Sequence, residues 1–172
     1  MGAIKKRDTV ATSKFKKAST KAGLSVHKGK QAMDPCYHGG VTLQKKFSFT
    51  CSVDLDDHFQ KEEPHSPRWD YGVGVRCPDG GEIALWIEPH PAGSTSDAKE
   101  MLKKLKWLKE VLNREQFKEL RHLHKNALKH TNLPYRWLIS ANSKIRIPPH
   151  SKEAKAIAFE GLDLPRRRIV LP

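Results

Sequence analysis

Residues 68–90 constrain the fold of this chain more than any other stretch. They contain two short apolar runs, residues 71–75 and 83–87, separated by a Pro-Asp-Gly-Gly sequence. Such turn residues reverse the chain between antiparallel strands, so the stretch predicts a β-hairpin. If the two runs pair, Asp70 and Glu88 meet at the open end of the hairpin. Two carboxylates held that close repel each other unless a cation or a proton lies between them.

The charge of the chain predicts a polyanionic partner. The 172 residues carry a formal net charge of +13, and only 37% of them are hydrophobic. Nucleic acid is the simplest partner for such a protein, and an anionic membrane surface is the alternative. The apolar runs are much shorter than a membrane span requires, which predicts a soluble protein without a transmembrane segment. The length is typical of one domain with extensions.

The three cysteines indicate a reducing compartment. Cys36, Cys51 and Cys77 are odd in number and share no Cys-x-x-Cys spacing, so neither a disulfide framework nor a zinc knuckle is expected. Cys36 and His38 could form half of a metal site, but no second half follows. We therefore expect buried thiols in a cytoplasmic protein.

Residues 1–35 are predicted to be a disordered basic arm that precedes an α/β domain over residues 36–172. The arm holds nine Lys or Arg residues against two acids, and its few large apolar residues follow no period. Such a segment buries too little surface to offset the entropy lost on ordering. It acts either as a solubilising tail or as a phosphate-binding arm, in which Lys5, Lys6 and Arg7 would contact nucleic acid.

The rest of the chain predicts a mixed central β-sheet flanked by helices. Alternating apolar residues indicate a strand to about Cys51, and Ser52 is the expected cap of a short helix over residues 53–60. A capping box formed by Asp97 and Glu100 predicts a helix to about residue 112, and Asn113 would cap a second one. Later elements are strands over 135–140 and 144–147, a helix capped by Ser151 and a final strand over 169–171.

Basic side chains recur on the predicted helices and near the end of the chain. Solvated charge is the ordinary interpretation of such faces, and phosphate contact is the alternative. The residues assigned to nucleic-acid contact outside the arm are Lys99, Lys103, Arg166, Arg167 and Arg168.

The predicted order of elements and the two acids resemble the PD-(D/E)XK nuclease superfamily, to which many restriction and repair endonucleases belong. In that family an Asp opens one strand of a hairpin, a Glu-x-Lys or Asp-x-Lys lies on the next strand, and a helix and a further strand complete the core. Asp70 matches the first acid and Glu88 the second, while His90 stands where Lys is usual. The resemblance covers roughly residues 53–140. It implies a restriction-endonuclease-like core.

The resemblance also implies a Mg²⁺-dependent phosphodiesterase, a hydrolase that cleaves nucleic acid. Asp70 and Glu88 would hold the metal, which neutralises phosphate charge and lowers the pKa of bound water. His90 shares a strand face with Glu88 and would assist as a weaker substitute for Lys. Lys99 or Lys103 on the following helix could take that role instead. The alternative function is a catalytically inactive module that binds nucleic acid or a protein partner.

Two other sets of residues have structural interpretations. His122, His124 and His130 lack the i, i+4 spacing of a helical metal pair, so we do not expect them to bind zinc. The four tryptophans lie inside predicted elements, which favours core packing over base stacking.

Overall fold

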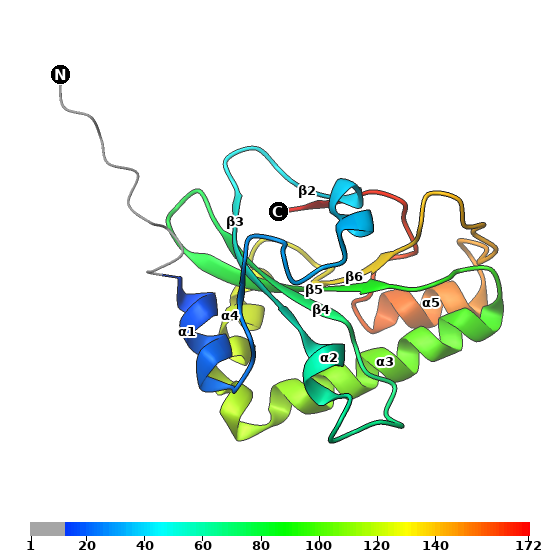
Figure 1. Ribbon diagram of the computed structural model, residues 1–172. Coiled ribbons are helices and arrows are strands. Elements are labelled where there is room, and N and C mark those ends of the chain that lie inside the picture. Colours follow the sequence, from blue (N-terminus) through cyan, green and yellow to red (C-terminus); the bar gives the residue numbers. More distant parts are fainter. Residues whose placement is uncertain (1–12) are drawn as a thin grey trace.

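The computed structural model describes residues 13–172 and shows an α/β protein built on a mixed sheet (Figure 1). The sheet order is β1-β3-β4-β5-β6, and only the β5–β6 pair is parallel. Its strands are β1 (His27–Lys28), β3 (Ser48–Asp54), β4 (Tyr71–Arg76), β5 (Glu82–Pro89) and β6 (Tyr135–Leu138). The predicted mixed sheet with flanking helices is confirmed.

The predicted hairpin is formed by β4 and β5. Tyr71 pairs with Ile87 and Val75 with Ile83, so the strands are in register along their whole length. Gly80 adopts a positive φ of 85° in the turn, a conformation that glycine reaches without strain. Asp70 and Glu88 are therefore neighbours at the open end, as the sequence predicts.

Two glycines of β4 allow other elements to approach its backbone closely. A Cβ atom on Gly74 would lie 2.5 Å from the Phe15 ring, and one on Gly72 would lie 2.7 Å from the Trp86 ring. Both distances are shorter than real Cβ contacts allow. The Gly72-Val-Gly74 sequence is thus explained by close packing against the strand.

Five helices cover one face of the sheet, and a small second layer covers the other (Figure 1). The helices are α1 (Lys14–Lys21), α2 (Leu55–Phe59), α3 (Thr95–Asn113), α4 (Lys118–Ala127) and α5 (Lys152–Phe159), with the 3₁₀ turn η2 (Glu115–Phe117) between α3 and α4. The second layer holds the 3₁₀ helix η1 (Pro35–Gly40) and a two-stranded parallel sheet of β2 (Val41–Leu43) and β7 (Ile169–Leu171). Hydrophobic side chains fill the spaces on both sides of the main sheet.

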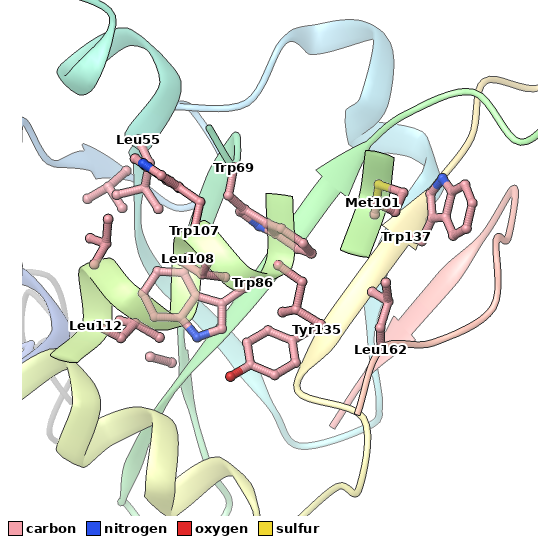
Figure 2. Close-up of a cluster of buried hydrophobic side chains, with 14 of the residues drawn as sticks. Leu55, Trp69, Trp86, Met101, Trp107, Leu108, Leu112, Tyr135, Trp137 and Leu162 are labelled. Carbon is pink, nitrogen blue, oxygen red and sulfur yellow. The ribbon is translucent and has the colours of Figure 1, made fainter. Parts of the chain in front are cut away.

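The core under the helices is rich in aromatic residues (Figure 2). Trp69, Trp86 and Trp137 are fully buried, and Trp107 is 5% exposed. This confirms that the tryptophans pack in the core and do not form an exposed surface for base stacking.

The prediction of a disordered arm over residues 1–35 is wrong for residues 13–35, and residues 1–12 lie outside the described part of the chain. Phe15 and Ala18 of α1 are buried in the main core, and β1 pairs with β3. α1 is a helix of eight residues with few apolar side chains. A helix of that length depends on tertiary packing for its stability, which local composition does not reveal.

Several element boundaries also differ from the prediction. Asp54, and not Ser52, caps α2, so β3 continues further than expected. Ser94, and not Asp97, caps α3, and Asp97 occupies the third position of its capping box. Residues 144–147 form a single bridge between Ile145 and Ala92 and not a strand.

The second predicted helix also starts later than expected. Asn113 is the last residue of α3, and α4 begins at Lys118, after η2.

Other predicted features of the second half are confirmed. Ser151 caps α5, β6 lies within the predicted strand, and residues 169–171 form β7. Cys51 and Cys77 are buried as expected, whereas Cys36 is exposed. Among residues 13–172, no helix has both the length and the apolar character needed to cross a bilayer.

Candidate active site

The two predicted acids lie on the helix-covered face of the sheet. Asp70 immediately precedes β4, and Glu88 lies near the end of β5. Trp86 faces the helical core, and side chains on one strand face recur every second residue, so Glu88 points the same way. A Cβ on Gly72 would contact Trp86, which places Asp70, two residues earlier, on this face too.

Lys104 of α3 brings the two carboxylates together around one ammonium group. Its Nζ donates to Glu88 Oε1 and, at 3.2 Å, to Asp70 Oδ1. The backbone N–H of Asp70 donates to Glu88 Oε2 at 2.7 Å. The side chains of Glu88, Lys104 and Asp70 are 0%, 16% and 26% exposed. Both acids are thus within reach of a single cation, and Asp70 is the member nearest to solvent.

Burial makes the negative charge of this cluster unfavourable. It raises the pKa of Glu88 well above its usual value, and the Asp70 carboxylate raises that pKa further against the opposing effect of Lys104. Burial also raises the pKa of Asp70. Although burial lowers the pKa of Lys104, the attraction of Glu88 and Asp70 outweighs it and raises this pKa. Two carboxylates with one ammonium leave one negative charge that a second cation would neutralise.

Lys104 is not among the site residues predicted from the sequence, although other lysines of this helix are. Lys99 is exposed, and Lys103 is exposed and pairs with Glu100. Lys104 follows Met101 by three positions and precedes Leu108 by four, and both of these are buried. Residues at these spacings share one helix face, so a lysine within the apolar stripe was the signal that could have identified it.

His90 does not take the position of the family's lysine. Its Nδ1 lies 2.9 Å from the Pro91 carbonyl oxygen, and its ring packs edge-on to Trp137 with centroids 6.3 Å apart. Within residues 13–172, no hydrogen bond or ion pair joins His90 to Asp70 or Glu88. The predicted catalytic assistance by His90 is not supported by this geometry.

A third acid lies close to the cluster and has its own partner. Asp56 of α2 helps to raise the pKa of Asp70, after the larger effect of burial. Its carboxylate accepts a hydrogen bond from Arg68 Nε at 2.8 Å. Asp56 therefore adds negative potential to the site while remaining bound to Arg68.

The donor set fits a cation that keeps part of its water shell. Among the described residues, no three His, Cys, Asp or Glu side chains lie together as a metal-binding group. A closed zinc site needs three or four such ligands. Mg²⁺, in contrast, is commonly held by one or two carboxylates together with water and substrate phosphates. Asp70 and Glu88 would be those carboxylates.

The basic residues predicted to contact nucleic acid are placed differently from one another. Arg166 Nε donates to Asp163 at 2.9 Å, and Arg167 donates to the carbonyl oxygens of Ala141 and Ser143. Arg168 is exposed, as are Lys99 and Lys103. Lys5, Lys6 and Arg7 lie outside the described residues.

Comparisons of the chain with family models, curated proteins and solved structures found no match. The function proposed below is therefore based on the site itself.

Proposed function

We propose that this protein binds nucleic acid and hydrolyses its phosphodiester bonds with Mg²⁺ held by Asp70 and Glu88. One observation carries the proposal: two carboxylates from paired strands converge on the ammonium group of the next helix. The two carboxylates can act as metal ligands, and the ammonium group can donate hydrogen bonds to a phosphate or a water molecule. When bound, Mg²⁺ neutralises phosphate charge and lowers the pKa of its bound water.

The fold supports the same assignment. β3 and β4 pair antiparallel, and β4 and β5 form the hairpin. The chain then passes through α3 and α4 to β6, which pairs parallel with β5. A hairpin with one acid on each side of its open end, followed by helical structure and a further strand, is the arrangement on which the PD-(D/E)XK resemblance rests. We therefore propose a restriction-endonuclease-like core, in which the lysine comes from α3 and not from the strand.

Each residue has a distinct role in this proposal. Asp70, the most exposed of the three, would hold the metal from the solvent side of the site. Glu88 is fixed by the Asp70 backbone N–H and supplies the buried ligand. The Lys104 ammonium would donate to the attacking water or to a phosphate oxygen and would stabilise charge that develops there.

A cleavage assay on supercoiled plasmid and single-stranded DNA and RNA tests this function. The wild-type chain is incubated with Mg²⁺, Mn²⁺ or EDTA beside Asp70→Asn, Glu88→Gln and Lys104→Met. We expect metal-dependent cleavage that each substitution lowers by at least about 100-fold, since each removes a group that acts on the reacting phosphate.

Lys106→Met is the matched control for Lys104→Met. Lys106 lies on the same helix, but it is exposed and forms no hydrogen bond or ion pair with Asp70 or Glu88 within residues 13–172. We expect its cleavage rate to stay within about twofold of wild type because it contacts neither carboxylate. No cleavage of any substrate, or equal loss in both lysine variants, would contradict the catalytic assignment.

Binding without cleavage is the second candidate function. It is favoured by the complete burial of Glu88 and by the position of Lys104 between the carboxylates, where a metal would bind. This function predicts salt-sensitive nucleic-acid binding that Glu88→Gln leaves unchanged, with no Mg²⁺-dependent cleavage.

A further inference from the structure

A basic groove lies between α1 and α4, away from the candidate active site. The two helices are neighbours on the helical face of the sheet (Figure 1), and the cavity between them has a volume of about 640 Å³. Its lining includes one acid, Glu119, and six cationic side chains: Lys14, Lys17, Lys21, Lys118, Arg121 and Lys125.

The cations form two facing rows with the same helical spacing. On α1 they occupy positions 14, 17 and 21, and on α4 they occupy positions 118, 121 and 125. Side chains at i, i+3 and i+7 share one face of a helix. At 1.5 Å rise per residue, each row spans about 10 Å. That is about three phosphates of one strand, at 3.4 Å per phosphate along a duplex axis.

Much of this charge has no counterion in the described structure. Lys21 pairs with Glu119, Lys118 pairs with Glu115, and Arg121 donates to the Leu112 carbonyl oxygen. The ammonium groups of Lys14, Lys17 and Lys125 form no hydrogen bond or ion pair within residues 13–172, and all three residues are exposed. Like charges facing each other across a groove repel, so the arrangement favours an anion between them.

The lining also indicates the class of anion. Its apolar members, Ala18 and Leu123, are aliphatic, and among the described residues that line it His122 alone carries a ring on which a base could stack, beside six cations. A concave surface with cations on both walls fits an extended chain of negative charges better than a flat lipid headgroup layer. We infer that this groove binds the sugar–phosphate backbone of a nucleic acid without regard to sequence.

This inference extends the proposed function by giving the substrate a second contact. Glu82, at the start of β5, accepts hydrogen bonds from Ser13 Oγ at 2.6 Å and from the Lys14 backbone N–H at 2.7 Å. The N-terminus of α1 is thus held at the opposite end of β5 from Glu88. Glu88 lies six positions after Glu82, a distance of about 20 Å along the strand. A duplex contacting both places would span about six base pairs.

Fluorescence anisotropy with a labelled 20-base-pair DNA duplex, in EDTA to prevent cleavage, tests the groove separately from the active site. The test variant carries Lys14→Gln, Lys17→Gln and Lys125→Gln. The charge-matched control carries Lys45→Gln, Lys152→Gln and Lys155→Gln, at exposed positions outside the groove. We expect the test variant to bind at least about tenfold more weakly at 0.1 M salt. Its slope of log K against log salt should be smaller by about 2 to 3, while the control changes by less than half as much.

Two further measurements separate the outcomes. Chemical acetylation of wild-type lysines, with and without duplex, should show protection of Lys14, Lys17 and Lys125. Equal loss of binding in both triple variants, or no protection, overturns the groove assignment. So does groove-dependent binding to phosphatidylserine vesicles or to poly-glutamate without binding to DNA. If the protein cleaves no substrate but still binds DNA through the groove, only the proposed catalytic function is overturned.

Discussion

At the scale of single residues, the main feature of the site is the negative charge of Glu88, which burial makes unfavourable. Glu88 is completely buried, yet its nearest charged neighbours are another carboxylate and one ammonium group. A buried carboxylate beside a second one lowers stability, and clusters of this kind are frequent at functional sites.

Replacing Glu88 by Gln should stabilise the protein at neutral pH. The pKa of Glu88 is raised by burial, so the native state holds its proton more tightly than the unfolded state. Wild-type stability therefore falls as pH rises above about 4.5, the ordinary value, towards the raised one. In Glu88→Gln, Lys104 still pairs with Asp70 and the amide oxygen still accepts from the Asp70 N–H, so the mutant loses the buried negative charge and one hydrogen bond from Lys104. We expect a gain of roughly 1–3 kcal/mol at pH 8 that shrinks towards zero near pH 4.5.

Urea unfolding of wild type and Glu88→Gln across this pH range measures the difference. Glu100→Gln, at a more exposed acid on α3, is the control and should change stability by less than about 0.5 kcal/mol. A destabilised Glu88→Gln at pH 8 would contradict the account of the buried charge.

At the scale of elements, His124 joins α4 to two strands. Trp86 Nε1 of β5 donates to its Nδ1 at 3.1 Å, and the Tyr135 hydroxyl of β6 lies 3.1 Å from its Nε2. Because Nδ1 accepts this hydrogen bond, it carries no hydrogen, and the neutral ring has its hydrogen on Nε2. Burial, with a smaller effect from the charges of Lys109 on α3 and Lys125 on α4, lowers the pKa of His124 to about 4.

The protein should therefore lose stability as pH falls from about 6.5 to about 4. In that range His124 is protonated in the unfolded state and neutral in the native state. The lowered pKa corresponds to a decrease of about 3 kcal/mol in the free energy of unfolding over this range. His124→Gln retains an acceptor for Trp86 and a donor for Tyr135 but does not titrate, so its stability should vary less over this range.

The control is His122→Gln, which changes an exposed histidine on the same helix. Its free energy of unfolding should follow that of wild type from pH 4 to 7. If His124→Gln shows the same pH dependence as His122→Gln, then His124 is not the titrating group.

At the scale of the whole molecule, α1 belongs to the folded domain. Its N-terminus is held by Glu82, which also accepts a hydrogen bond from Thr50 Oγ1 at 2.5 Å, and Phe15 packs over Gly74 of β4. α1 also supplies one wall of the basic groove. The same helix thus contributes to the core and to the surface with the proposed phosphate contact.

Phe15→Ala should destabilise the whole protein by about 3–5 kcal/mol, because the ring is completely buried. Lys16→Ala, at the next position and exposed, should cost less than about 0.5 kcal/mol. Chemical unfolding followed by tryptophan fluorescence measures both, since the buried tryptophans report on the main core. A Phe15→Ala protein as stable as wild type would mean that α1 is peripheral, as a tail would be.

Local sequence patterns were sufficient for the hairpin and for the pairing of its acids. Strand alternation and a glycine turn act over a few residues, so they fixed the register that places Asp70 opposite Glu88. The helix capped by Ser151 and the strand β6 were predicted for the same reason. The α3 boundary was missed by one turn because Ser94 and Asp97 both begin a capping-box pattern, and packing of the first turn decides between them.

Other features depended on contacts between residues far apart in the chain. Lys104 and Lys103 differ by about 100° around the axis of α3, and only the docking of that helix on the sheet makes the former a partner of Glu88. α1 has too few apolar residues to be stable alone, and Phe15 finds its place over Gly74, 59 positions later. The basic groove requires two helices that the sequence separates by nearly a hundred residues. By itself, the sequence determined a mixed α/β protein with two acids at one hairpin end. Tertiary packing alone decided which lysine joins those acids and which cations face each other, because both depend on how helices dock on the sheet.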